Sequence, residues 1–329
     1  MALLHAVHEA RSRFSVFPEV QALTIDHGFR QESAGEARWV RSACSALGIS
    51  HRTAVPEAPA PHSAIQDRAR RARLDAFRQV VGLVLTAHTL DDDAETAVMR
   101  RQRGAGDHPG IAPLVWLHGT WLHRPLLSLR RTALRDWLAT RRVAWIDDPS
   151  NANDRFERVR IRKALSVEPD MATRLANEAR ARSARRIKTG QEAAMIFESG
   201  KRATGGELSL PLRDSVSIQG PAFNLAIRAA CGHVAAHENL PSASLISNAL
   251  STLSGAGTVA SAARCVLRRS STHVTVERER RQGAPTPLAP ALHPWPSHVP
   301  SHDLALANAV YRAVGQLPIP DPPATIGRT

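Results

Sequence analysis

Three acidic residues lie close together, directly after the apolar run from Val80 to Leu85. Asp91, Asp92 and Glu95 are three or four positions apart, so a helix would place all three on one face. Like charges this close repel, and the cluster costs stability unless a cation, an arginine or a bound substrate offsets it. Acidic residues also favour the first turn of a helix, where the macrodipole suits them, so a purely structural role stays open.

A second polar cluster ends the first apolar strand. Asp26 closes the segment 20–26 and is followed by His27 and Gly28, and His88 holds the corresponding place before the acids. We expect helices over 1–11, 32–47 and 63–80, and strands over 20–26, 49–55 and 81–87. Strands that alternate with helices indicate a parallel α/β sheet covered on both faces. Ligands bind beyond the carboxyl ends of such strands, so the two clusters predict one pocket.

The second half has a different pattern. From Trp121 onward we expect mostly helix, over 126–140 and 158–186, and then a weaker α+β region with a strand at 274–276. The pattern predicts an α/β domain over 1–150, a helical region over 151–204 and a small domain over 205–282. The tail, 283–329, is rich in proline and histidine, and we expect it to be poorly ordered outside one helix at 304–314.

The chain is strongly basic. Its 329 residues carry 43 lysines and arginines against 30 acidic residues, a net charge of +13, which favours a polyanionic partner such as nucleic acid. Nearly all of the cations are arginine, which suits RNA binding and equally suits a GC-rich coding sequence. No apolar run approaches the length of a bilayer span, so we expect no membrane partner.

The cysteines and the first residues indicate the compartment. Cys44, Cys231 and Cys265 are too few and too scattered for a zinc site or a disulfide framework, which is typical of a reducing compartment. The first ten residues lack the apolar core of a signal peptide. We therefore expect a cytoplasmic protein.

Further motifs complete the pattern. They are Ala69–Arg73, Arg103-Gly104-Ala105-Gly106, Arg124-Pro125-Leu126-Leu127, and Asp147–Asn151 leading into Arg158–Arg162. No single one is specific, but in this order, with Asp26–Arg30 upstream, the set resembles the tRNA(Ile)-lysidine synthetase family of ATP pyrophosphatases. The close resemblance covers about 1–165, and from 205 to 281 a looser one suggests the family's small RNA-binding domain.

The resemblance implies both a fold and an activity. The fold would be a parallel Rossmann-like sheet of the adenine nucleotide alpha hydrolase type, followed by a helical region and a smaller α+β domain. Enzymes of this family use ATP to adenylate the wobble cytidine of the tRNA(Ile) that has a CAU anticodon. The amine of L-lysine then displaces AMP, and the resulting lysidine changes the tRNA from methionine to isoleucine identity. ATP and Mg²⁺ are the implied cofactors.

The resemblance also assigns roles to residues. It implies a catalytic group of Asp91, Asp92, Glu95 and Arg158, with Asp91 as a base toward the lysine amine and Asp91 and Asp92 as Mg²⁺ ligands. It implies nucleotide contacts for Asp26, Arg30, His88, Arg70 and Arg103. Two of these have ordinary alternatives, since His88 could cap or pack at a strand end and Arg70 could belong to a solvated helix face.

One family feature is not found in the sequence. The family has a first strand and a phosphate loop of the type Ser-Gly-Gly-x-Asp-Ser, followed by a helix that starts much as Met1-Ala2-Leu3-Leu4 does here. We expect the strand to belong between those ending at Asp26 and Ala87, and a chain lacking both to bind ATP poorly and to be unstable. Either Met1 is internal to a longer reading frame or the gene is degenerate, and the intact motifs favour the first. A milder departure is Asp93, where glutamine is usual in the family.

Two rival functions stay open. Another tRNA-modifying enzyme of the same group, such as a thiolation enzyme, would need catalytic cysteines, usually paired, and the three here are not so placed. A catalytically inactive tRNA-binding remnant would share the basic surface and lack nucleotide turnover. Lysine-dependent release of AMP separates the remnant from a synthetase.

Overall fold

The structure is a computed structural model of the chain. It describes residues 1–15, 17–26, 33–55, 72–77, 79–80, 82–104, 109–117, 120–147, 153–202, 206–212, 217–235, 237, 240–279 and 299–313. The chain divides into two compact units, the first made of 1–113 and 119–179 and the second of 114–118 and 180–329. Among the described residues, no helix combines the length and hydropathy needed to cross a bilayer.

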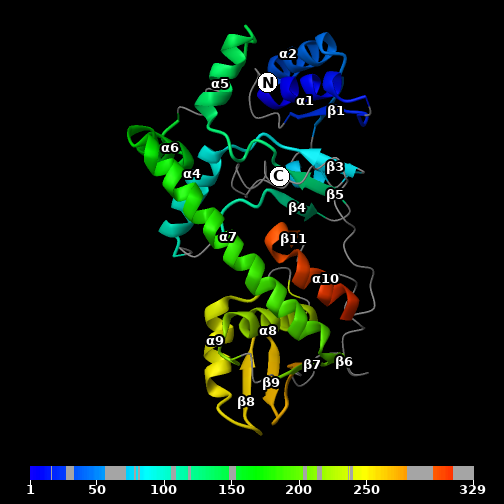
Figure 1. The fold of residues 1–329 in the computed structure, drawn as a ribbon, viewed down its shortest axis with the longest axis vertical. Helices are drawn as coiled ribbons and strands as arrows, with labels where there is room; N and C mark the ends of the chain where they lie inside the picture. Colours follow the sequence, from blue (N-terminus) through cyan, green and yellow to red (C-terminus); the bar gives the residue numbers. More distant parts are fainter. Residues whose placement is uncertain are drawn as a thin grey trace. The chain divides into compact units, whose positions relative to one another are not determined.

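The first unit begins with two helices and a pair of parallel strands. α1 (Ala2–Arg13) and α2 (Ser33–Ala46) lie beside β1 (Gln21–Ile25) and β2 (Ser50–Ala54) (Figure 1). β1 and β2 pair in parallel, with Gln21 opposite Ser50 and Ile25 opposite Ala54. The predicted helices and strands of this segment are confirmed to within two residues at most ends, as is their parallel arrangement.

A second pair of parallel strands includes the strand that ends shortly before His88. β3 (Gly82–Leu85) pairs with β5 (Thr120–His123), with Leu85 opposite His123. The structure assigns β1 and β3 to different sheets, and no described strand lies hydrogen-bonded between them.

Three helices of the chain share a hydrophobic core. α4 (Leu90–Gln102) packs against α7 (Pro169–Glu198) through a core of Leu90, Ala94, Ala172, Leu175 and Ala176. Leu165 of α6 (Glu157–Val167) packs against the same core.

Two helix predictions were wrong in their bounds. The single helix expected over 158–186 is α6 followed by α7, because a proline at position 169 disfavours helical backbone in the residue before it. The helix expected from 126 begins only at Arg131, as α5 (Arg131–Thr140), because turns occupy the preceding residues.

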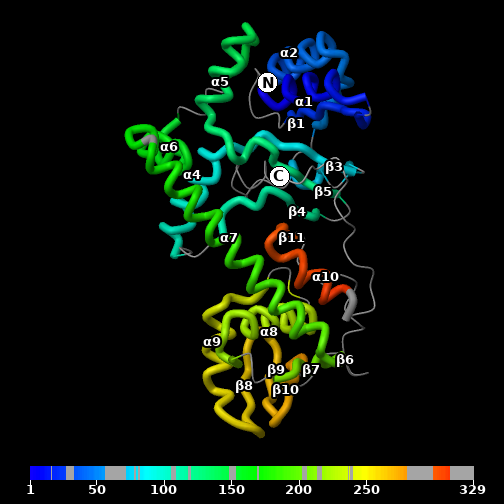
Figure 2. The backbone as a smooth tube through the Cα atoms, in the orientation of Figure 1, coloured from blue at the N-terminus to red at the C-terminus, as the bar shows by residue number. Residues whose placement is uncertain are grey.

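The second unit is an antiparallel sheet covered by helices. Its strands are β6 (Lys201–Arg202), β7 (Leu208–Pro211), β8 (Val259–Ala262), β9 (Cys265–Arg269) and β10 (His273–Arg278), in the order β6-β7-β10-β9-β8. α8 (Pro221–Val234) and α9 (Ala243–Thr252) lie beside this sheet (Figure 2). Phe223, Leu267 and Val274 are fully buried between the layers. The predicted α+β character and the strand at 274–276 are confirmed.

The second unit also contains part of the expected tail. β11 (Val299–Pro300) pairs antiparallel with β4 (Leu114–Leu117), and η2 (Ser301–Asp303) leads into α10 (Leu304–Ala313). Asp303 is buried and accepts a hydrogen bond from Arg186 Nε at 2.7 Å. The helix predicted at 304–314 is confirmed as α10, whose Leu306 and Val310 are buried, whereas β11 and η2 correct the expectation that the rest of the tail is poorly ordered at 299–303.

Candidate functional site

A capping box fixes the start of the acidic helix. Thr89 N–H donates to Asp92 Oδ2 at 2.7 Å, and Asp92 N–H donates back to Thr89 Oγ1 at 3.4 Å. The two reciprocal bonds satisfy amide groups that a helix start leaves without partners. They also fix where α4 begins, and on this helix Asp91, Asp92 and Glu95 face α5 and α6.

Four arginines, at the start of α5 and on α6, form ion pairs with the three acids. Arg130 and Arg131 stand at the start of α5, and Arg158 and Arg162 lie one turn apart on α6. Glu95 Oε2 accepts from Arg158 Nε at 2.6 Å, and Glu95 Oε1 accepts from Arg162 Nε at 2.8 Å. Asp92 Oδ1 accepts from Arg158 Nη2 at 3.0 Å and Arg131 Nη2 at 3.2 Å, and Asp91 pairs with Arg130 at 3.0 Å. We call these seven residues the acid–arginine cluster.

The arginines offset the repulsion that the sequence predicts. Burial raises the pKa of Asp92, but hydrogen bonds from Thr89 and the charges of Arg158 and Arg131 outweigh it and hold the pKa below its usual value. Glu95 is only 1% exposed and is surrounded by three guanidinium groups. Buried carboxylates need such partners, so the cluster is a fixed arrangement of charges.

The cluster does not fit a protein-bound Mg²⁺ ion. Asp91 Oδ1 pairs with Arg130, and Asp91 Oδ2 accepts the backbone N–H of Arg131 at 2.6 Å. Both oxygens of Asp92 are engaged by Thr89 and by arginines. Among the described residues, no group of three or more histidines, cysteines or acids is placed to hold a metal. The oxygens of Asp91 and Asp92 are therefore occupied by arginines and backbone N–H groups, and the two acids do not fit the expected role of magnesium ligands.

His88 lies half-buried beside the cluster and pairs with Thr86 Oγ1 through Nδ1 at 2.9 Å. Burial and then the nearby Arg124, with smaller effects of Arg158 and Arg73, lower its pKa to about 4, against an opposing effect of Asp92. The imidazole is therefore neutral at physiological pH. Arg124 is itself fixed, because its guanidinium donates to the carbonyl of Ala112 at 2.5 Å.

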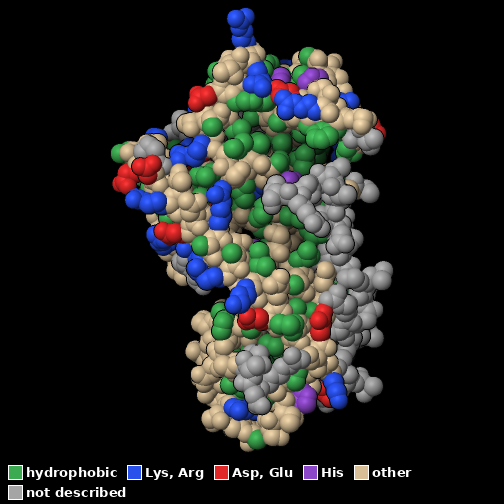
Figure 3. Space-filling view, in the orientation of Figure 1, with side chains coloured by type: hydrophobic (Ala, Val, Ile, Leu, Met, Phe, Trp, Pro, Cys, Tyr) green, Lys and Arg blue, Asp and Glu red, His purple; other side chains and the backbone are tan. Residues whose placement is uncertain are grey.

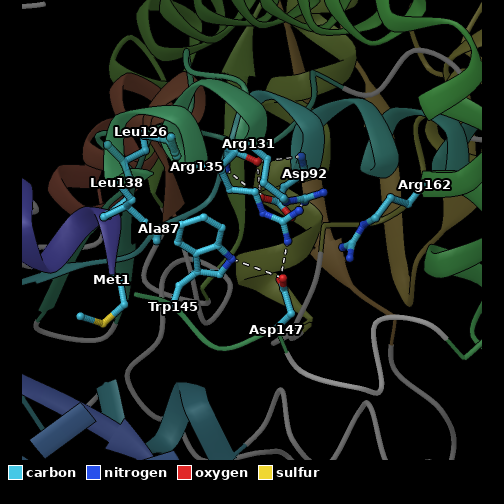
Figure 4. Close-up of a pocket in the computed structure, with 13 residues that line it drawn as sticks. Met1, Ala87, Asp92, Leu126, Arg131, Arg135, Leu138, Trp145, Asp147 and Arg162 are labelled. Carbon is cyan, nitrogen blue, oxygen red and sulfur yellow. Dashed lines mark hydrogen bonds and ion pairs between the residues drawn. The ribbon is translucent and has the colours of Figure 1, made fainter. Parts of the chain in front are cut away.

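A cavity of about 390 Å³ opens beside the cluster. One wall is apolar and includes Leu126, Leu134, Leu138 and Trp145, and the other carries Asp92, Arg131, Arg135, Asp147 and Arg162 (Figure 4). Met1 and Ala2, at the start of α1, also line it. Helix N-termini present N–H groups and a positive dipole end, so this cavity combines several features that attract anions.

Other predicted site residues lie elsewhere. Asp26, at the carboxyl end of β1, accepts from Ser33 Oγ at 2.7 Å, and its side chain does not line the cavity. Arg103 pairs with Glu157 at 2.5 Å on the surface. Arg30 and Arg70 fall outside the described residues. The structure thus brings together Asp91, Asp92, Glu95, Arg158 and His88, and not Asp26 or Arg103.

Sequence reasoning missed three residues at the site. Arg130 and Arg131 complete the cluster, and Trp145 forms part of the cavity wall. Adjacent arginines at a helix start resemble an ordinary solvated face, so no local signal marks the pair. Trp145 stands just before the Asp147–Asn151 motif, and its proximity to that motif was the available signal.

Additional cations lie on α6 and α7. Arg160, Lys163 and Arg174 are exposed, as is Arg155 just before α6, and Figure 3 shows blue side chains along this part of the first unit. Some of them pair with surface acids, such as Lys163 with Asp154 at 2.6 Å. Exposed pairs of this kind bind weakly, so their cations remain available to a polyanion.

Known proteins resemble this chain over much of its length. Residues 1–168 match the family model described as "PP-loop domain". A protein of Rhizobium meliloti named tRNA(Ile)-lysidine synthase is 32% identical over 307 residues, which are 85% of this chain and 65% of that protein. Proteins of the same name from Mesorhizobium japonicum and Hyphomonas neptunium are 40% and 43% identical over 51% and 45% of this chain, and 40% and 43% of their own lengths. The chain thus spans between 40% and 65% of the length of these relatives.

Proposed function

The chain belongs to the PP-loop domain family, and from that membership we propose that it acts as a tRNA(Ile)-lysidine synthetase. The observation that carries the proposal is the 32% identity, over 85% of the chain, with a relative of that name. The substrates would be ATP, L-lysine and the tRNA(Ile) with a CAU anticodon. A tRNA substrate places the activity in the cytoplasm.

The geometry supports an ATP-dependent reaction on RNA. The start of α1 and the arginines of the cluster converge on one cavity, where charged phosphates would find N–H donors and guanidinium groups. ATP supplies the activation by transferring AMP to the cytidine base with loss of pyrophosphate. Fixed positive charges such as Arg131 and Arg162 would stabilise the negative charge that develops on those phosphates.

Each acid would position arginines. Glu95 orients three of them, Asp92 orients two and caps α4, and Asp91 holds Arg130 and the first N–H of α5. Asp91 is also the acid that we propose as base toward the lysine amine, which loses a proton as it displaces AMP. His88, being neutral, would contribute hydrogen bonding rather than charge.

Arg103, Arg30, Arg70 and Asp26 take outer roles in this proposal. Arg103 stands on the exposed surface, where contact with the tRNA backbone suits it. Asp26 lies at a neighbouring strand end, the edge where nucleotides bind in parallel sheets. Arg30 and Arg70 are proposed as phosphate contacts from the sequence resemblance alone.

The thiolation alternative is disfavoured by the cysteines. Cys44, Cys231 and Cys265 are all buried, with side chains that reach no solvent. Catalytic cysteines must meet their substrate, so none of the three is placed for that chemistry.

The test is AMP release from radiolabelled ATP, with a tRNA(Ile) transcript that has a CAU anticodon, in the presence and absence of L-lysine. We expect AMP release that depends on both lysine and the tRNA, and a transcript with a CAC anticodon serves as control. Tight tRNA binding with no AMP release would establish the remnant instead. AMP release that does not depend on lysine would indicate the activity of another enzyme of the family.

A further inference from the structure

We propose that the cavity beside the acid–arginine cluster is a nucleotide subsite in which Trp145 stacks on a base and Arg131, Arg135 and Arg162 contact its phosphate. The inference rests on the proposed function and deepens it, because it names the residue that holds a planar base. It also gives the ligand a direction, with the base against the apolar wall and the phosphate toward the cluster.

The cavity has the size and the walls of a ligand site. Its volume of about 390 Å³ falls within the range of roughly 300–1,000 Å³ typical of small-molecule sites. Leu126, Leu134 and Leu138 line the wall on which Trp145 stands. A flat ring next to aliphatic side chains is the arrangement by which proteins hold bases without reading their edges.

The indole ring is held by its edge. Trp145 Nε1 donates to Asp147 Oδ2 at 3.3 Å, and Arg135 pairs with the other carboxylate oxygen of Asp147. Figure 4 shows this bond between the edge of the ring and Asp147, and Trp145 is 37% exposed. A large aromatic side chain with this much exposure in a cavity is suited to stacking.

The charges of the wall favour an anion. The lining carries three arginines against two carboxylates, Asp92 and Asp147. Both carboxylates already accept hydrogen bonds on each oxygen, from Thr89, arginines and Trp145. The three arginines are themselves paired with these carboxylates or with Glu95, but a guanidinium has five N–H donors, and at 28–46% exposed each can add a contact to a phosphate.

Two substrates of the proposed reaction contain a base with a phosphate. The base is either the target cytosine of the tRNA or the adenine of ATP. Both stack on an indole ring, so the structure assigns the shared chemistry and a titration separates the sources.

The experiment is ¹⁹F NMR of the protein labelled with 5-fluorotryptophan, titrated with CMP, with ATP and with L-lysine. The chain has six tryptophans, and Trp145→Phe and Trp137→Phe assign two of the signals. Trp137 is the control, because it lies against Arg141 at 4.2 Å and does not line the cavity.

We expect a saturable shift of the Trp145 signal with no shift of the Trp137 signal. A shift with CMP assigns the subsite to the RNA base, and a shift with ATP alone assigns it to adenine. No shift with either nucleotide, or a shift with lysine alone, overturns the proposal. Because this readout needs no turnover, a Trp145 shift in a protein that releases no AMP would count against the proposed activity and not against the subsite.

Kinetics separate stacking from a structural role. Trp145→Leu should raise the KM of the nucleotide substrate identified by NMR about 10-fold with little change in kcat, since stacking stabilises the bound state. Trp145→Phe keeps a flat ring and should stay within about 3-fold of the parent. If both variants lose kcat and melting temperature equally, the tryptophan is only structural.

Discussion

The carboxylate of Glu95 accepts a hydrogen bond from Arg158 Nε at 2.6 Å, although the two residues stand 63 positions apart. Glu95 is 1% exposed and also binds Arg131 and Arg162, so one buried acid joins α4 to α5 and α6. The stability of the first unit and the geometry of the cluster therefore depend on the same side chain.

Glu95→Gln should lower the free energy of unfolding by about 2–4 kcal/mol, because three guanidinium groups would lose a buried counter-charge. Urea unfolding followed by circular dichroism measures this free energy. Glu178→Gln is the matched control, since Glu178 pairs with Arg101 on the surface and should cost less than about 0.5 kcal/mol. Equal effects of the two substitutions would contradict the central position of Glu95.

Asp91→Asn should reduce lysine-dependent AMP release by at least about 100-fold while tRNA affinity changes less than about 2-fold. The amide oxygen can still accept the N–H of Arg131, so the start of α5 is preserved, while the charge, the basic oxygen and the ion pair with Arg130 are lost. Single-turnover assays and filter binding give the two readouts. An active Asp91→Asn protein would remove Asp91 from the chemistry.

His88 predicts a pH dependence of stability. Its folded pKa of about 4 lies below the unfolded value near 6.5, so the unfolded chain binds a proton first as the pH falls. The contribution of neutral His88 is complete above about pH 6.5 and is lost progressively as the pH falls toward 4. Melting temperatures between pH 7.5 and 4.5 should fall less steeply for His88→Asn than for the parent protein. Parallel curves would mean that His88 is not held neutral.

Gly110→Ala should destabilise the protein strongly. Gly110 has φ +80°, and an added Cβ would meet Asp93 Oδ1 and the Cβ of Ala179, each at 2.7 Å. Gly104 has a similar φ of +76° with open space around it, so Gly104→Ala isolates the cost of the backbone, about 1–2 kcal/mol. We expect Gly110→Ala to cost at least about 1–2 kcal/mol more in denaturant unfolding. Similar losses would show that the Asp93 contact gives way easily.

Some of this architecture can be predicted from local patterns and some cannot. Alternation of apolar and helical segments located β1, α2, β2 and β3, whereas most of the helix predicted over 63–80 lies outside the described residues. β4 and β5 are as short as β3, but they follow each other directly, without the helix on both sides that helped to locate β3, and they were missed. The acids of the cluster were found through their spacing on α4, and the need for a neutralising arginine was anticipated. The sequence could not identify which arginines neutralise the acids, because Arg131 and Arg162 reach Glu95 only through tertiary packing.

The capping box at Thr89 and Asp92 forms within one helical turn, whereas the cations that neutralise the acids come from 36 to 67 positions further along the chain. Local contacts form early in folding, and closing long loops takes longer. During synthesis the three acids therefore leave the ribosome before the arginines that neutralise them. Their mutual repulsion is not fully offset until Arg162 has also been made. The cluster therefore needs α6 in place, and its completion depends on a segment made well after the acids themselves.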